Sequence, residues 1–446
     1  MSRRDSALRF FDENKEFMET VVRENIERYR KANARIRLVD GSGQPLSGVR
    51  VSVELKNHEF RHGANIFMLD EMESAEKNAR YRDAFAEVFN LATIPFYWSD
   101  LEPEEGKPRL AKDSPRIYRR PAPDLCVEYC LERGIEPKCH CLNYENFTPT
   151  WVKYCDVATH KRKLEKRFRE LAERYADVIP SWEVTNETLQ YMPERKRHSK
   201  FYSEPDHLDW SYRMADRYFP ANRLIINDYY LFDEVSWIGD RSPYYMQIER
   251  LLRNGITHLD SIGMQFHSFF PREAEASRAE FRYDPVRIYE VLDQYARLGR
   301  KLQITEITLP AYSDSPEDEA VQAELLEKLY TVFFSHPEME AAIYWNLVDG
   351  YAAFAPQGDM TVGENRYYGG LMRFDLSEKP AFRALRRLFH ETWHTQLTAE
   401  TDSEGYLTFR GFCGDYELTV TRDGKTTILP YLLSREKCAG ETQTVK

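Results

Sequence analysis

Trp182-Glu183-Val184-Thr185-Asn186-Glu187 is a short apolar run that ends in an amide and a carboxylate. Seven similar runs occur elsewhere in the chain, and helix-favouring stretches such as 161–176, 285–298 and 316–333 separate some of them. This alternation predicts βα units around a parallel sheet, and eight strands are the number that closes a barrel. We therefore predict an α/β fold, a (β/α)8 TIM barrel over residues 58–394. Its strands are expected at 61–65, 91–94, 136–140, 181–186, 224–227, 261–265, 303–306 and 342–345.

Most of the predicted strands end in side chains that can take part in chemistry. In a (β/α)8 barrel the carboxyl ends of all strands surround one pocket, so residues far apart in sequence meet there. We therefore expect one site that contains side chains from at least six strands. They are His140, Asn186 with Glu187, Asn227 with Asp228, Gln265 with His267, Glu306, and Trp345 followed by Asp349.

The two ends of the chain differ from this pattern. Residues 1–34 are charged and helix-favouring, and they predict an amphipathic helix. Residues 35–57 alternate polar and apolar side chains around a Gly/Pro turn and predict a β-hairpin, and residues 395–446 show the same alternation. Because an isolated hairpin cannot bury its apolar face, we expect the two segments to form a small β-sandwich, similar to transthyretin-related modules. A role in tying the termini together is favoured over carbohydrate binding.

Composition excludes several classes of function. A formal net charge of -11 disfavours nucleic acid or an anionic membrane as partner. The chain has no apolar stretch of about 18 residues, and its N-terminus lacks the apolar core of a signal peptide. We expect a cytoplasmic protein, or a secreted one if a signal was removed, that is a monomer or homodimer. Cys139-His140-Cys141 has no second ligand pair at zinc-like spacing, so we predict no metal and no cofactor.

Glu187 and Glu306 each follow an apolar run at a predicted barrel strand. A pair of buried carboxylates can cleave a glycosidic bond, because one protonates the leaving oxygen while the other attacks the anomeric carbon or activates water. The spacing of the two groups decides between retention and inversion, and the sequence leaves that choice open. A lone glutamate is more commonly solvated or ion-paired.

The chain resembles glycoside hydrolase family 10, the endo-β-1,4-xylanase family, between about Phe60 and Leu388. Trp182-Glu-Val-Thr-Asn-Glu187 is similar to the family's Trp-Asp-Val-Val-Asn-Glu, and Ile304-Thr-Glu306-Ile is similar to its Ile-Thr-Glu-Leu-Asp. Five further blocks agree in order. They are His140-Cys-Leu-Asn-Tyr-Glu-Asn-Phe-Thr-Pro-Thr-Trp151, Asn227-Asp-Tyr229, Ile262-Gly-Met-Gln-Phe-His267, Tyr344-Trp345-Asn-Leu-Val-Asp349 and Lys379-Pro-Ala-Phe382.

The resemblance implies a role for each matched residue. Glu187 would be the general acid/base and Glu306 the nucleophile. Asn186 would bind the sugar 2-hydroxyl, and His267 would orient Glu306 and favour its charged form. The remaining predicted substrate-binding residues are His140, Gln265, Trp345, Tyr144, Trp98, Asn227 and Tyr229.

The sequence departs from the family where the sugars on the non-reducing side of the cut would bind. The family has Glu, Asn and Lys in that block, whereas this chain reads Phe89-Asn-Leu-Ala-Thr-Ile-Pro-Phe-Tyr-Trp98 and is about two residues shorter. Tyr144 stands in place of a Trp, Phe147 of a Gln and Asn346 of a Gly. We therefore expect intact bond-cleaving groups beside a remodelled subsite, and a substrate other than plain linear xylan.

The sequence supports a retaining hydrolase of xylan, xylo-oligosaccharide or a related β-glycan, with an oligo- or polysaccharide as its partner. Two alternatives stay open. One is a carbohydrate-binding protein that has kept the barrel but lost useful catalysis, and the other is a hydrolase of a non-xylan β-glycoside.

Overall fold

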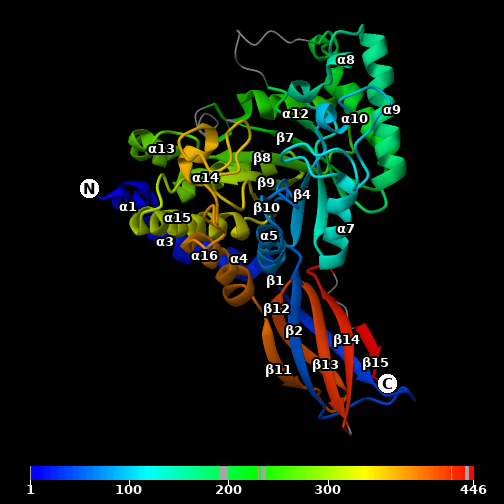
Figure 1. Ribbon diagram of the computed structural model, residues 1–446. Coiled ribbons are helices and arrows are strands. Elements are labelled where there is room, and N and C mark those ends of the chain that lie inside the picture. Colours follow the sequence, from blue (N-terminus) through cyan, green and yellow to red (C-terminus); the bar gives the residue numbers. More distant parts are fainter. Residues whose placement is uncertain are drawn as a thin grey trace.

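Eight parallel strands close into a barrel at the centre of the computed structural model (Figure 1), which describes residues 2–189, 199–229, 231–232, 238–422, 424–436 and 441–445. The strand order is β10-β3-β4-β5-β6-β7-β8-β9, with the last strand paired to the first. All eight predicted strands are present, which confirms the barrel. Their bounds are β3 (Arg61–Asn65), β4 (Leu91–Pro95), β5 (Glu136–His140), β6 (Ser181–Asn186), β7 (Arg223–Asp228), β8 (Ser261–His267), β9 (Lys301–Thr308) and β10 (Met339–Tyr344).

One main helix follows each barrel strand and covers its outer face (Figure 1). Local signals set the helix ends: Ser315 caps α15 through the Asp318 N–H, and Pro316 occupies its first position. Gly134 ends α7 in the left-handed conformation at φ 66°. The helices are α5 (Ala75–Val88), α7 (Pro123–Arg133), α9 (Val157–Tyr175), α10 (His207–Tyr218), α12 (Pro243–Arg253), α14 (Pro285–Ala296), α15 (Pro316–Ser335) and α16 (Pro380–Arg387), with shorter α6 (Trp98–Leu101), α8 (Thr150–Lys153) and α13 (Glu275–Arg282).

The register of the barrel brings the polar strand ends to one level. Asn186 at the end of β6 lies beside Asn227 of β7, and Gln265 of β8 lies beside Glu306 of β9. All six residues of β6 are buried, so a fully buried strand carries its terminal amide to the barrel mouth. The fold therefore assembles the predicted site from neighbouring strands.

Strands from both ends of the chain form two small sheets below the barrel (Figure 1). One sheet has the order β12-β1-β15 and the other β11-β2-β13-β14. The predicted hairpin over 35–57 is wrong, because its two strands do not pair with each other but enter different sheets. The bounds are β1 (Lys31–Val39), β2 (Arg50–His58), β11 (Gln396–Glu400), β12 (Tyr406–Phe412), β13 (Gly414–Arg422), β14 (Lys425–Leu433) and β15 (Glu441–Thr444).

The N-terminal segment is helical but broken into short pieces, and it ends at Arg30 rather than at residue 34. The pieces are α1 (Arg3–Ala7), α2 (Arg9–Glu13), α3 (Lys15–Phe17), a π-helical turn (Met18–Val22) and α4 (Arg23–Arg30). Arg3 anchors the first piece, since its buried guanidinium pairs with Glu275 and Asp318 and donates to the Pro310 and Ala311 carbonyls. The segment is thereby fastened to the loop that follows β9.

No helix within the described ranges is long and apolar enough to cross a membrane. Over the same ranges, no group of three or more His, Cys, Asp or Glu side chains is arranged to hold a metal ion. The six cysteines placed by the structure are free thiols: Cys126, Cys130, Cys139, Cys141, Cys155 and Cys413.

Candidate active site

Glu187 follows β6 directly and has an unusual backbone conformation, with φ 49°. Non-glycine residues in this region are destabilised by roughly 1–3 kcal/mol, and such residues concentrate at functional sites. The Glu187 N–H donates to the Asn227 carbonyl at 3.1 Å, which helps to hold the turn. The carboxylate accepts from the Tyr144 hydroxyl and, at 3.2 Å, from Gln265 Nε2. Glu187 is partly exposed, and the hydrogen bonds from Tyr144 and Gln265 fix the orientation of its carboxylate.

Glu306 lies deeper, on β9, and only 4% of it is exposed. Its Oε1 accepts from Asn227 Nδ2 at 2.9 Å, and its Oε2 lies 3.0 Å from His267 Nε2. The other ring nitrogen of His267, Nδ1, lies 2.9 Å from the Thr308 hydroxyl. The predicted contact between His267 and Glu306 is therefore present.

A chain of side-chain amides connects the two carboxylates. Gln265 Nε2 donates to Glu187 and, at 3.4 Å, to Asn186 Oδ1. Asn227 Nδ2 donates to the same Asn186 oxygen at 2.8 Å and to Glu306, while Asn227 Oδ1 accepts from the Thr305 hydroxyl at 2.6 Å. Because each amide is fixed by two partners, the two carboxylates are held in one rigid network.

Gly263 on β8 leaves the space that Asn227 occupies. A Cβ at residue 263 would lie 2.7 Å from Asn227 Oδ1 and 2.8 Å from the Ile226 carbonyl oxygen. We expect Gly263→Ala to displace the Asn227 amide and to lower the free energy of unfolding by about 1–3 kcal/mol, the usual effect of overpacking. Denaturant unfolding measures this change. Gly41→Ala is the control, since nothing lies within 4 Å of a Cβ there, and an equal small effect of both substitutions would contradict the prediction.

The protonation of Glu306 is coupled to the tautomer of His267. Burial raises the pKa of Glu306 to about 8, although the nearby His140 cation and the Asn227 hydrogen bond act in the opposite direction. Burial also lowers the pKa of His267 to about 4, so this ring is neutral at pH 7. A charged Glu306 requires the His267 proton on Nε2, whereas a protonated Glu306 can donate to Nε2 and leave the proton on Nδ1. The expected stabilisation of the charged form by His267 is therefore outweighed by burial.

The raised pKa makes Glu306 a pH-dependent source of instability. Its protonated form is favoured in the folded state, so its contribution to stability is fully present below its usual pKa of 4.5 and is lost as the pH rises through about 8. We expect Glu306→Gln to unfold at a higher temperature than the wild type at pH 9, by about 1–3 °C, and at the same temperature at pH 4. Thermal unfolding across this range tests the sign. A difference that shrinks as pH rises would contradict the buried titration.

A buried triad of charges lies beneath this network. The Glu183 carboxylate on β6 contacts Lys138 Nζ and lies 2.5 Å from His140 Nδ1, and all three side chains are almost fully buried. Burial lowers the pKa of His140, but the Glu183 carboxylate outweighs it and the net shift is upward. Burial in turn raises the pKa of Glu183, but Lys138 and His140 outweigh it and lower the value to about 2. Glu183 therefore favours the charged form of His140, and this positive charge acts on Glu306.

Aromatic side chains from the segments that follow β10, β3, β4 and β5 form the opposite half of the barrel mouth. The Tyr97 ring stacks on Phe147 at a centroid distance of 4.0 Å, and its hydroxyl lies 3.0 Å from His140 Nε2. Phe67 packs edge-on against Trp345 at 5.4 Å. We call this group the aromatic wall; its residues are Phe67, Tyr97, Tyr144, Phe147 and Trp345. It faces the polar half, which comes from β6 to β9.

The structure does not support the predicted sugar-binding role of three residues. Trp98 points away from the site, because its Nε1 donates to Glu102 and its ring packs edge-on against Trp151. Asn227 is fully buried and connects Asn186 to Glu306, so it positions other groups rather than contacting a sugar. His140 has both ring nitrogens engaged, by Glu183 and Tyr97.

The other predicted binding residues lie in or near the barrel mouth. Asn186, Gln265 and His267 lie in the polar half, Tyr144 and Trp345 lie in the aromatic wall, and Tyr229 is partly exposed just beyond β7. Glu183 and its partner Lys138 are the main residues that the motifs did not single out.

A (β/α)8 barrel whose strand ends hold two carboxylates in one amide network is the architecture of a glycoside hydrolase. Comparison with known families gives the particular group. The glycosyl hydrolase family 10 model matches residues 61–387, and the chain belongs to this family.

Individual relatives are distant in sequence. The anti-sigma-I factor RsgI6 of Acetivibrio thermocellus is 26% identical over 427 residues, which cover 94% of this chain and 49% of that protein. Endo-1,4-beta-xylanase 1 of Arabidopsis thaliana is 22% identical over 92% of this chain and 38% of its own length. The chain thus spans half or less of these curated relatives.

Solved structures support the fold. Xylanase B from Clostridium stercorarium F9 aligns with a TM-score of 0.58 at 21% identity, over 73% of this chain and 96% of that one. Xylanase XynB from Paenibacillus barcinonensis, solved with a conduramine derivative, aligns with a TM-score of 0.57 at 21% identity over 73% and 95%. These alignments cover most of the chain but not all of it.

Proposed function

We propose that this protein is a retaining β-glycoside hydrolase that acts on β-linked xylo-oligosaccharides, xylan or a related β-glycan. One observation carries the proposal: a single amide network fixes both carboxylates. Gln265 donates to Glu187, Asn227 donates to Glu306, and both amides donate to Asn186 Oδ1. A protein that only binds sugar has no need to fix two carboxylates relative to each other.

The reaction has two steps in this proposal. The ionised Glu306 attacks the anomeric carbon while Glu187 gives its proton to the glycosidic oxygen, which leaves with the departing sugar. Glu187 then takes a proton from water, the water oxygen attacks the same carbon, and the bond to Glu306 breaks. Asn186 uses its oxygen for Gln265 and Asn227, which leaves Nδ2 to donate to a sugar hydroxyl as the transition state forms.

The aromatic wall supports a substrate that differs from linear xylan. Glu183 favours the charged form of His140, in which Nε2 donates to the Tyr97 oxygen and the Tyr97 hydroxyl proton is left to donate to a sugar. Next to it, Arg119 Nη1 and Nη2 both donate to Asn346 Oδ1 at 3.1 Å, so this amide oxygen is already occupied. We propose that this side binds a decorated sugar, an unusual linkage or an aryl group, because apolar rings replace the polar contacts that an unsubstituted xylose would need.

A product screen tests the proposal. The purified protein is incubated with β-xylans, β-glucans, xylo-oligosaccharides and aryl β-glycosides, with Glu306→Ala as control, and the first anomer released is followed by NMR. We expect the β-anomer to appear first, and short or aryl substrates to be cleaved better than linear xylan. An initial α-anomer would contradict retention, and equal release by the Glu306→Ala variant would contradict the site.

A second candidate is a carbohydrate sensor with weak catalysis. Two observations favour it: the relative that matches 94% of this chain is named as an anti-sigma factor, and burial raises the pKa of Glu306 to about 8. Calorimetric titration with xylo-oligosaccharides separates the candidates. Binding without any product over a long incubation supports the sensor, whereas turnover supports the hydrolase.

A further inference from the structure

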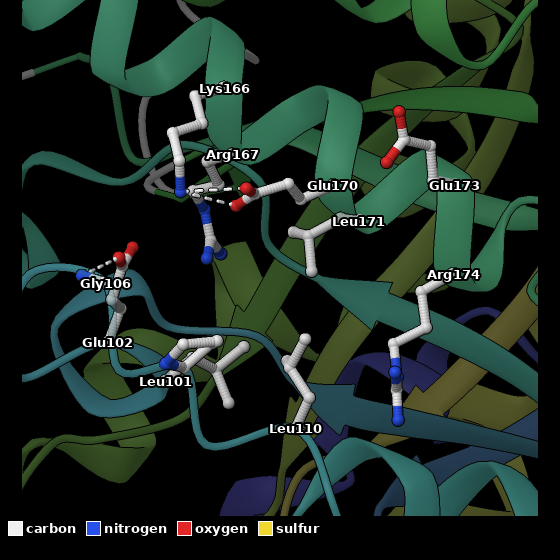
Figure 2. A pocket seen from close by; sticks show the side chains of 11 residues that line it. Leu101, Glu102, Gly106, Leu110, Lys166, Arg167, Glu170, Leu171, Glu173 and Arg174 are labelled. Atoms are coloured by element: carbon white, nitrogen blue, oxygen red, sulfur yellow. Dashed lines mark hydrogen bonds and ion pairs between the residues drawn. The ribbon is translucent and has the colours of Figure 1, made fainter.

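A second pocket lies outside the active site, between the loop over residues 101–110 and helix α9 (Figure 2). Its volume of about 650 Å³ is in the range of small-molecule sites in proteins. Leu101, Leu110 and Leu171 contribute apolar surface, and charged side chains from α9 lie around them. None of the residues that line this pocket belongs to the candidate active site.

Arg167 is the central polar group of this pocket. Only 5% of it is exposed, and Figure 2 shows its guanidinium extending between Glu102 and Leu171. Nε donates to the Leu142 carbonyl at 3.1 Å, and Nη2 donates to the Phe96 and Cys141 carbonyls. Nη1 makes no hydrogen bond within the part of the chain that the structure describes.

The other charged groups around the pocket already have partners. Lys166 pairs with Glu170 at 2.8 Å, Glu173 lies 3.8 Å from Arg169, and Arg174 pairs with Asp124. The Glu102 carboxylate accepts from Trp98 Nε1 at 3.0 Å and from the Gly106 N–H at 2.8 Å. Among the lining residues in the described ranges, Arg167 and Glu102 are the two charges without an ion pair, and Glu102 interacts with Arg167 only at longer range.

We propose that this pocket binds a small carboxylate with an apolar body. Burial of the Arg167 guanidinium is not compensated by an ion pair at contact distance, and an anion beside Nη1 would compensate it by a charge-assisted hydrogen bond. The three leucines suit an apolar body better than a sugar or a bare, strongly hydrated ion. The site goes beyond the proposed hydrolase function and needs no turnover.

The position of the pocket places a bound anion directly behind the aromatic wall. The carbonyls that hold Arg167 belong to Phe96 and Cys141, the chain neighbours of Tyr97 and His140. The Phe96 N–H also donates to the His140 carbonyl at 2.6 Å. The new pocket and the catalytic cleft therefore share two backbone segments but no lining side chain.

Calorimetric titration of the full chain with benzoate at pH 7 tests the proposal, and benzamide is the neutral probe of the same shape. We expect saturable benzoate binding that is at least about tenfold tighter than benzamide binding. Arg167→Gln should weaken benzoate by at least about tenfold, whereas Glu306→Gln should leave its affinity unchanged. Equal affinity for both probes, no saturable binding, or displacement of benzoate by xylobiose would overturn the proposal.

Circular dichroism shows whether Arg167→Gln folds. If it does not fold, two variants of surface residues on α9 test the site instead. Lys166→Glu reverses a half-exposed charge at the pocket, and Arg169→Glu makes the same change on the same helix at a residue that does not line it. We expect the first to weaken benzoate about two- to fivefold more than the second, because the interaction is partly screened. Equal effects of the two variants would count against the site.

Discussion

Replacement of Glu306 by alanine is expected to abolish turnover of an aryl β-xyloside. The substitution removes the proposed nucleophile. Without this carboxylate the covalent glycosyl–enzyme intermediate cannot form. Loss of a nucleophile that acts together with an acid/base group lowers kcat by roughly 10⁴-fold or more. The initial rate of aryl release at a saturating substrate concentration measures the effect.

Glu340→Ala provides the control for this experiment. Glu340 also lies on a barrel strand, but near the beginning of β10, where it accepts hydrogen bonds from Ser261 and Gln303. Its loss should affect stability and leave kcat within about a factor of two to three. A fall in kcat of the same size in both variants would show that the loss reflects damage to the barrel.

Glu187→Ala is expected to separate substrates by their leaving groups. A dinitrophenyl group departs without a proton, whereas a phenyl group requires one, so only the second depends on the general acid. We expect kcat/KM to fall by about 10²–10⁴-fold for the phenyl glycoside and by about tenfold or less for the dinitrophenyl glycoside. Steady-state kinetics on the two substrates give this comparison.

Azide adds a second readout for the Glu187→Ala variant. Without the general base, the glycosyl–enzyme intermediate waits for water, and a small anion that needs no proton removal can attack in its place. We expect azide to raise kcat on the dinitrophenyl substrate and to have no such effect on the wild type. An equal loss on both leaving groups, with no azide effect, would remove Glu187 from the acid/base role.

The barrel could be predicted from sequence because its strands are buried on both faces and therefore appear as apolar runs. The small sheets were harder. The turn after Asp40 correctly predicts that β1 ends there. A turn signal does not show which strand pairs with β1 in the sheet. Lys31 pairs with Phe412 and Leu55 with Tyr416, contacts that depend on residues more than 350 positions away.

The catalytic pair could be predicted because each glutamate follows a strand that the apolar pattern locates. The error at Trp98 has a local cause: β4 ends at Pro95, and the short helix α6 that begins at Trp98 turns this ring outward, so Tyr97 reaches the site in its place. The buried pair of Lys138 and Glu183 was not predicted, although the sequence contains an indication of it. A charged residue inside a run that must be fully buried needs a partner, and these two residues are each other's partner.

The two small sheets impose an order of events on synthesis. Strands β1 and β2 leave the ribosome well before β11 to β14, whose first residue is Gln396. At about 5–20 residues per second, the interval is roughly 20–70 s. During this time the nascent chain presents unpaired strand edges while the barrel forms between them. Any chain released before β11 keeps those edges open, so premature termination is expected to produce an aggregating fragment even when the barrel itself is complete.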